Sequence, residues 1–142
     1  MAYICLQMPD FHMKTVLLID DDADDREIFQ EILLSLNLNI RYEEARNGAH
    51  AVEKLNTQSF QKPDLIFLDL NMPVMDGRQF LLHIKQEDTY SDIPVIIYST
   101  SSSEEDKAFA LKNNAALFMT KHYSMTQLEK DLRKTITAFL GF

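Results

Sequence analysis

Acidic residues end two apolar stretches of this chain, and a lysine ends a third. Asp69 follows the run LIFL, the cluster DDDADD from Asp20 to Asp25 follows TVLLI, and Lys121 follows LFMT. Carboxylate oxygens suit hard divalent cations such as Mg²⁺, and a bound metal ion stabilises the charge of a transferred phosphoryl group. If the three chain segments meet, these residues predict a phosphoryl-transfer site that holds Mg²⁺.

Each candidate residue has a role that follows from its chemistry. The Asp69 carboxylate can attack a phosphoryl group as a nucleophile and form an aspartyl phosphate. Catalysis of such a transfer is mostly positioning and electrostatic stabilisation. We therefore expect Asp20 and Asp21 to hold the metal, Lys121 to pair with phosphoryl oxygens, and the Ser99 hydroxyl to donate to another oxygen.

Short apolar or β-branched runs alternate with segments of helical periodicity. Continuous runs of this kind indicate a parallel sheet covered on both faces, because an exposed face would show alternation. We expect four of the five runs to be buried strands. The runs are Thr15–Ile19, Ile40–Ala45, Leu65–Leu68, Val95–Tyr98 and Ala116–Met119.

The intervening segments predict five helices. Apolar residues at helical spacing mark helices around Ile28–Leu36, Ala51–Leu55 and Phe80–Ile84. Capping-box spacing starts two more at Ser103 and Ser124, and Gly141 is the expected end of the last. Five βα units predict an α/β fold, a flavodoxin-like (βα)5 doubly wound three-layer sandwich with strand order 2-1-3-4-5. Ligands bind such a sheet beyond the carboxyl ends of its strands, where the candidate residues fall.

Length and composition indicate one domain. The chain has 142 residues, of which we assign 14–142 to the domain and 1–13 to a peripheral N-terminal extension. No apolar segment of about 18 residues or more predicts a membrane span, and no secretory signal is recognisable. We therefore expect a soluble cytoplasmic protein. The single cysteine, Cys5, cannot form an internal disulfide.

The net charge of the chain indicates which classes of partner it can bind. A net charge of -8 argues against direct binding to nucleic acid, whose affinity comes mainly from clustered Lys and Arg. Much of the acidity lies within Asp20–Glu27, which indicates a local need for cations.

Structural explanations compete with these functional ones. Asp69 could cap a turn, and Asp24 and Asp25 are expected mainly to serve the first turn of a helix, where acids suit the dipole. An EF-hand loop beginning at Asp20 is disfavoured, because the turn position that requires glycine is Asp25. Ser99 could simply form a local hydrogen bond, and the scattered histidines have no ligand spacing.

The motifs together resemble the response-regulator receiver domains of two-component signalling, over nearly all of residues 15–139. LLIDDDADD resembles the acidic pocket with Asp20 and Asp21, and LDLNMPVMDG resembles the phosphoacceptor loop around Asp69. The resemblance also implies that the backbone carbonyl of Asn71 ligates Mg²⁺. In PVIIYST it makes Ser99 the switch hydroxyl, and in LFMTK it makes Phe118 the switch aromatic and Lys121 the family's lysine.

The same resemblance implies that the protein is a signalling switch and not an enzyme. Such a switch assists its own phosphorylation and dephosphorylation. The donor would be a phosphohistidine on a sensor histidine kinase or a phosphotransfer protein, and the output would be binding to a downstream protein. A homodimer through the face of the fourth helix, fifth strand and fifth helix is a further expectation.

The chain departs from the family at two positions. The family usually has a cis proline after the lysine, whereas this chain has His122. A non-proline cis bond costs about 2.5–4 kcal/mol, which favours a trans bond and a reshaped loop. Phe118 also lacks the hydroxyl of the tyrosine that is often found there.

Two other functions stay open. One is a pseudo-receiver, an interaction module with the fold but without phosphorylation, which His122 makes more credible. The other is a phosphatase that uses Asp69 as its nucleophile. The haloacid-dehalogenase type has a second Asp two residues later, and here that residue is Asn71.

Overall fold

The computed structural model describes residues 13–142 except 102 and 123. Residues 1–12, which hold Cys5, Met8 and His12 and nearly all of the predicted extension, lie outside the described residues.

Five parallel strands form one sheet in the order β3-β2-β4-β5-β6. This is the predicted order 2-1-3-4-5, counted along the chain, so the predicted fold is confirmed. The strands begin and end within one residue of their predicted bounds. They are β2 (Lys14–Ile19), β3 (Ile40–Ala45), β4 (Leu65–Leu68), β5 (Val95–Ser99) and β6 (Leu117–Thr120).

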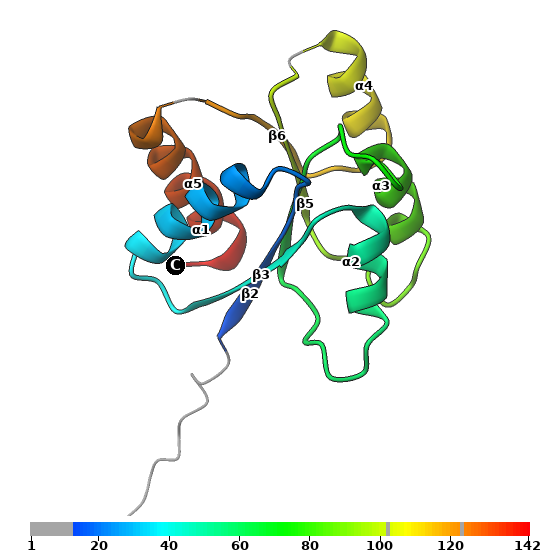
Figure 1. Cartoon of the computed structure of the whole chain (residues 1–142), viewed down its shortest axis with the longest axis horizontal. Coiled ribbons are helices and arrows are strands. Elements are labelled where there is room, and N and C mark those ends of the chain that lie inside the picture. Colours follow the sequence, from blue (N-terminus) through cyan, green and yellow to red (C-terminus); the bar gives the residue numbers. More distant parts are fainter. Residues whose placement is uncertain (1–12, 102, 123) are drawn as a thin grey trace, which may run out of the picture.

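Helices cover both faces of the sheet and make three layers. In Figure 1, α1 and α5 lie on one side of the strands, and α2, α3 and α4 lie on the other. The helices are α1 (Ala23–Ser35), α2 (Gly48–Leu55), α3 (Gly77–Lys85), α4 (Glu104–Lys112) and α5 (Met125–Leu140). Among the described residues, no helix is both long and apolar enough to cross a bilayer.

Alternate residues of the strands pack into two separate hydrophobic cores, one on each face of the sheet. In β2, Leu17 and Ile19 face the core beneath α2 and α3, whereas Val16 and Leu18 face the core beneath α1 and α5. The three central strands are buried along nearly their whole length, as a doubly covered sheet requires. The prediction of four buried strands was wrong, because β3 and β6 are the edges of the sheet and stay partly exposed.

Local sequence sets the helix ends. The Ser103 and Ser124 side chains accept hydrogen bonds from the backbone N–H groups of Asp106 and Gln127, so both predicted starts are confirmed. The last helix ends at Gly141, whose φ of 78° is left-handed and favours glycine.

Candidate functional site

The strand register places Asp20 and Asp69 side by side at the carboxyl edge of the sheet. Ile19 of β2 pairs with Leu68 of β4, and each acid is the next residue. The backbone N–H of Asp69 donates to the Ile19 carbonyl at 2.9 Å, and that of Asp20 donates to the Ala45 carbonyl at 3.0 Å. Hydrogen bonding of the sheet thus continues through both residues and holds their backbones in place.

The same edge receives Lys121 from the last strand. Ser99 pairs with Thr120 across β5 and β6, and the Lys121 N–H donates to the Ser99 carbonyl at 2.8 Å. The Lys121 ammonium lies 2.6 Å from Asp20 Oδ2 and 3.3 Å from Asp69 Oδ2. The predicted meeting of three distant chain segments therefore occurs.

Asp25 of α1 is a third partner of Lys121. Its Oδ2 lies 2.9 Å from the Lys121 Nζ, and its side chain is 36% exposed, whereas that of Asp20 is 0% exposed. Our expectation that Asp25 serves mainly the first turn of α1 was incomplete. Asp22 is the N-cap residue, and its side chain accepts from the N–H groups of Asp24 and Asp25. The sequence could not indicate the ion pair, since 96 residues separate Asp25 from Lys121.

Burial and ion pairing together shift the pKa values of these groups. Burial raises the pKa of Asp20 to about 6, against the lowering effect of the hydrogen bond from Lys121. It raises the pKa of Asp69 in the same way. Burial alone would lower the pKa of Lys121, but the hydrogen bonds to Asp20 and Asp25 and the charges of Asp20 and Asp69 together outweigh it and raise that pKa, so the ammonium is charged.

Three of the acids are close enough to share a metal ion. Carboxylate oxygens of Asp20, Asp21 and Asp69 all lie within 4.8 Å of one another. The donors are all oxygen, the set preferred by hard cations such as Mg²⁺ and Mn²⁺. Three carboxylates, those of Asp20, Asp25 and Asp69, contact the Lys121 ammonium, and Asp21 adds a fourth carboxylate close to Asp20 and Asp69. A divalent cation therefore fits both the donor chemistry and the local excess of negative charge.

The loop after β4 packs tightly against Asp69. The backbone N–H of Asn71 donates to Asp69 Oδ1 at 3.2 Å, and that of Gly77 donates to the Leu70 carbonyl at 3.0 Å. A Cβ at Gly77 would lie 2.2 Å from the Asp69 carbonyl oxygen, which explains why glycine stands there. Val74 and Met75 both have positive φ, of 50° and 63°. This turn brings the Met75 carbonyl to the Gly48 N–H at 3.1 Å.

Ser99 is buried at the end of β5, and its Oγ accepts a hydrogen bond from the Ser101 N–H at 3.2 Å. The Ser101 hydroxyl donates to Asp106 Oδ2 at 2.7 Å, and Arg78 of α3 pairs with Asp106 Oδ1 at 2.5 Å. These contacts connect Ser99 to the start of α4 and to α3. Sequence reasoning missed the pair of Arg78 and Asp106, because the two residues are 28 positions apart and the sequence between them carries no pairing signal.

The other predicted positions are also placed. Phe118 on β6 is half-buried and packs against the core on the side of α2, α3 and α4. The bond between Lys121 and His122 is trans, as His122 favours. His122 Nε2 lies 3.7 Å from Asp131 Oδ2. The EF-hand alternative is wrong, because Asp20 directly follows a strand and Ala23–Ser35 is a continuous helix.

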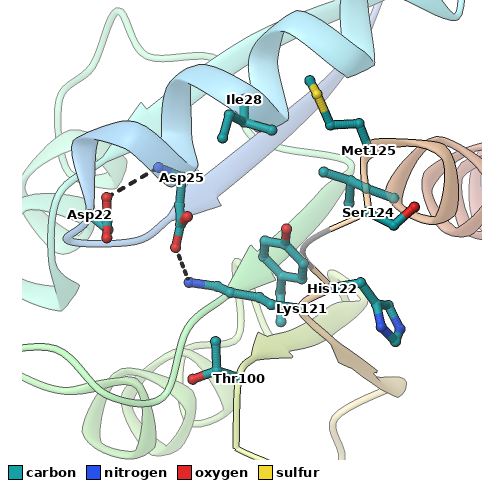
Figure 2. Close-up of a pocket in the computed structure, with 10 residues that line it drawn as sticks. Asp22, Asp25, Ile28, Thr100, Lys121, His122, Ser124 and Met125 are labelled. Carbon is teal, nitrogen blue, oxygen red and sulfur yellow. Dashed lines mark hydrogen bonds and ion pairs between the residues drawn. The ribbon is translucent and has the colours of Figure 1, made fainter.

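A cavity of about 270 Å³ adjoins Lys121 between α1 and the segment that joins β6 to α5. Figure 2 shows Lys121 reaching Asp25, with His122, Ser124 and Met125 around the cavity. Tyr98 also lines it, and its ring centroid lies 5.3 Å from the Lys121 Nζ.

Comparison with known proteins agrees with this geometry. The family model described as response regulator receiver domain matches residues 16–133. The chain belongs to this family. Receiver domains are the phosphoacceptor modules of two-component signalling, so the resemblance noted in the sequence is confirmed at the level of the family.

Full-length relatives and solved structures support the same assignment. The response regulator Rcp1 of Synechocystis sp. is 32% identical over 133 residues, which cover 91% of this chain and 88% of Rcp1. The phosphorylated cyanobacterial phytochrome response regulator RcpA has a TM-score of 0.83 and 30% identity, and the match covers 89% of this chain and 94% of RcpA. The Mn²⁺-bound form of Rcp1 has a TM-score of 0.79 and 30% identity, with 87% and 92% covered.

Other relatives are longer proteins. The chain spans 15% of the sensor histidine kinase CheAY of Helicobacter pylori and 48% of the transcriptional regulatory protein PhoB of Escherichia coli.

Proposed function

We propose that this receiver domain accepts a phosphoryl group on Asp69 from a phosphohistidine donor and then signals by binding a protein partner. The observation that carries the proposal is the position of Asp69. Its side chain is only 9% exposed, contacts the Lys121 ammonium, and shares a possible metal site with Asp20 and Asp21.

The reaction follows from the groups around Asp69. An Asp69 carboxylate oxygen forms a bond to phosphorus while the bond from phosphorus to the donor histidine nitrogen breaks, and the histidine leaves with both electrons of that bond. The Asn71 N–H and the Lys121 ammonium already hold the two oxygens of the Asp69 carboxylate. Lys121 would then donate to an oxygen of the arriving phosphoryl group.

A divalent cation, Mg²⁺ in our proposal, would be held by Asp20, Asp21, Asp69 and the backbone carbonyl of Asn71. It would supply charge stabilisation for the phosphoryl oxygens. The all-oxygen donor set and the excess of carboxylates support this, and the Mn²⁺-bound form of Rcp1 shows that a similar protein holds a divalent metal.

Ser99 and Phe118 are the proposed switch residues. A phosphoryl group on Asp69 offers additional charged acceptors, and new charge-assisted hydrogen bonds can draw a nearby loop inward. If the Ser99 hydroxyl donates to the group, its contact with the Ser101 N–H shifts, and with it the loop that leads to α4. The half-buried Phe118 ring would then repack on β6.

The partners remain proposals. A sensor histidine kinase or a histidine phosphotransfer protein is the proposed donor, and the downstream protein is unspecified. The face of α4, β6 and α5 is the proposed surface of a homodimer, and its exposed apolar residues include Leu111, Leu117 and Phe139. The excess of acidic residues supports action without direct binding to nucleic acid. A cytoplasmic location also stays a prediction.

Incubation with acetyl phosphate and Mg²⁺, followed at once by intact-mass measurement, tests the proposal. We expect one added phosphoryl group, which is absent without Mg²⁺ and in Asp69→Asn. Asp88 is an exposed acid in the segment that follows α3, so Asp88→Asn is the matched control and should react like the wild type. An unchanged mass in the wild type would favour the pseudo-receiver. Steady release of phosphate from many small esters would favour the phosphatase.

A further inference from the structure

Asp25 differs from the other partners of Lys121 in one respect. The described acids that approach one another closely enough to hold a metal are Asp20, Asp21 and Asp69, and Asp25 is outside this set. Its contact of 2.9 Å with the Lys121 ammonium is nevertheless shorter than the contact of 3.3 Å from Asp69. Asp25 is thus the partner that Lys121 does not share with the proposed metal site.

Both ends of this contact are fixed by the fold. Asp25 lies in the first turn of α1, where Asp22 Oδ1 accepts from its N–H at 3.2 Å. The next residue, Arg26, donates from its guanidinium to the Asp20 carbonyl at 2.8 Å and so ties the same turn to the end of β2. The Lys121 backbone is held by the Ser99 carbonyl. The Lys121 side chain therefore spans from β6 to α1 between two anchored points.

Occupation of the metal site would change the electrostatics of Lys121. With Asp20 and Asp69 bound to a divalent cation, their charge would be neutralised and the Lys121 ammonium would be repelled. The cavity bounded by Tyr98, His122 and Ser124 offers Lys121 space to move away from Asp69. Figure 2 shows Asp25 reaching Lys121 from the α1 side of this cavity.

We propose that Asp25 is a positioning residue that keeps the Lys121 ammonium beside Asp69 when Asp20 and Asp69 are engaged by a divalent cation. The proposal rests on the proposed function, because it makes Lys121 available to the phosphoryl oxygens. Asp25 itself touches neither the phosphoryl group nor the metal. A solely structural role, as an acid in the first turn of a helix, would predict no effect that depends on the metal.

Chemical labelling of Lys121 tests the placement without any phosphoryl transfer. The full chain is acetylated with an amine reagent in EDTA or in saturating Mg²⁺, and peptide mass spectrometry gives the rate at Lys121. We expect the wild type to stay protected in both conditions. Asp25→Asn should be protected in EDTA, where Asp20 and Asp69 hold the ammonium. In Mg²⁺ it should react about fivefold faster than the wild type, the upper range for a partly exposed ion pair.

Asp24→Asn is the matched control, since it removes the same charge from an exposed position in the same helical turn. It should behave like the wild type. Equal protection of Lys121 in the wild type and in Asp25→Asn at saturating Mg²⁺ would overturn the proposal, and so would an equal loss of protection in Asp24→Asn. If the wild type never takes up a phosphoryl group, the proposed function fails. The labelling rates would still show whether Asp25 holds Lys121 in place.

The rate at which acetyl phosphate phosphorylates the protein supplies the second test. At saturating Mg²⁺, Asp25→Asn should be phosphorylated about fivefold more slowly, and Asp25→Glu should recover part of the rate. In a Lys121→Gln background, Asp25→Asn should have no further effect, because Asp25 acts through Lys121. A further fivefold loss in that background would show that Asp25 acts by another route and would overturn the proposal.

Discussion

Asp20→Asn should stabilise the metal-free protein at neutral pH. Asp20 is fully buried, and burial raises its pKa from 3.8 to about 6. The folded state therefore binds the Asp20 proton more tightly than the unfolded state does. The resulting stability is fully present below the unfolded pKa of 3.8 and is lost as the pH rises through about 6. An asparagine has nearly the same shape but does not ionise.

The size of the effect follows from the pKa shift. One pKa unit corresponds to about 1.36 kcal/mol, so the ionised Asp20 lowers the free energy of unfolding by about 3 kcal/mol above pH 6. The substitution also removes the contact of 2.6 Å with Lys121, although Asp25 and Asp69 remain as partners. We therefore expect a net gain of about 1–3 kcal/mol at neutral pH.

Urea unfolding in EDTA at about pH 7.5 and about pH 4 measures this difference. The gain of Asp20→Asn over the wild type should be about 2 kcal/mol larger at the higher pH. Asp24→Asn, which removes an exposed charge from the adjoining helix, should change stability by less than about 0.5 kcal/mol. A variant less stable than the wild type at pH 7.5, or a gain that is the same at both pH values, would refute the reasoning.

Four further predictions concern the metal site, the loop after β4 and the contact between α3 and α4. Mg²⁺ at about 100 times its Kd should raise the free energy of unfolding by about 2.7 kcal/mol. Asp21→Ala should weaken Mg²⁺ binding, and an unaltered affinity in a titration would remove Asp21 from the site. Gly77→Ala should cost about 1–3 kcal/mol in urea unfolding, because its Cβ meets the Asp69 carbonyl, and an unchanged midpoint would mean that the loop relaxes. Arg78→Gln should cost about 1–3 kcal/mol at neutral pH, since it leaves the buried Asp106 without its ion pair. Hydrogen bonds from Ser101 and Arg78 lower the pKa of Asp106, so the stability they contribute is present above the ordinary Asp pKa and is lost as the pH falls. The cost of Arg78→Gln should accordingly shrink at about pH 3, and a cost independent of pH would exclude this cause.

Much of this protein follows from local sequence. An apolar run such as Leu65–Leu68 predicts a buried strand, and the spacing of Ser124 and Gln127 starts a helix through a contact between near neighbours. Once the strands are parallel, the residues that follow them must share one edge of the sheet. For that reason the sequence alone places Asp20, Asp69 and Lys121 at one site.

Contacts between distant elements were decided only by the tertiary structure. Asp25 lies in a helical turn whose sequence explains its acid locally, and the packing of α1 on the sheet is what brings it to Lys121 at the end of β6. The pair of Arg78 and Asp106 likewise depends on how α3 and α4 pack on one face of the sheet. The physical reason is that strand pairing and helix capping are encoded by short-range patterns. A side-chain ion pair between separate elements is set by the packing angles and register of the whole domain, to which many residues contribute.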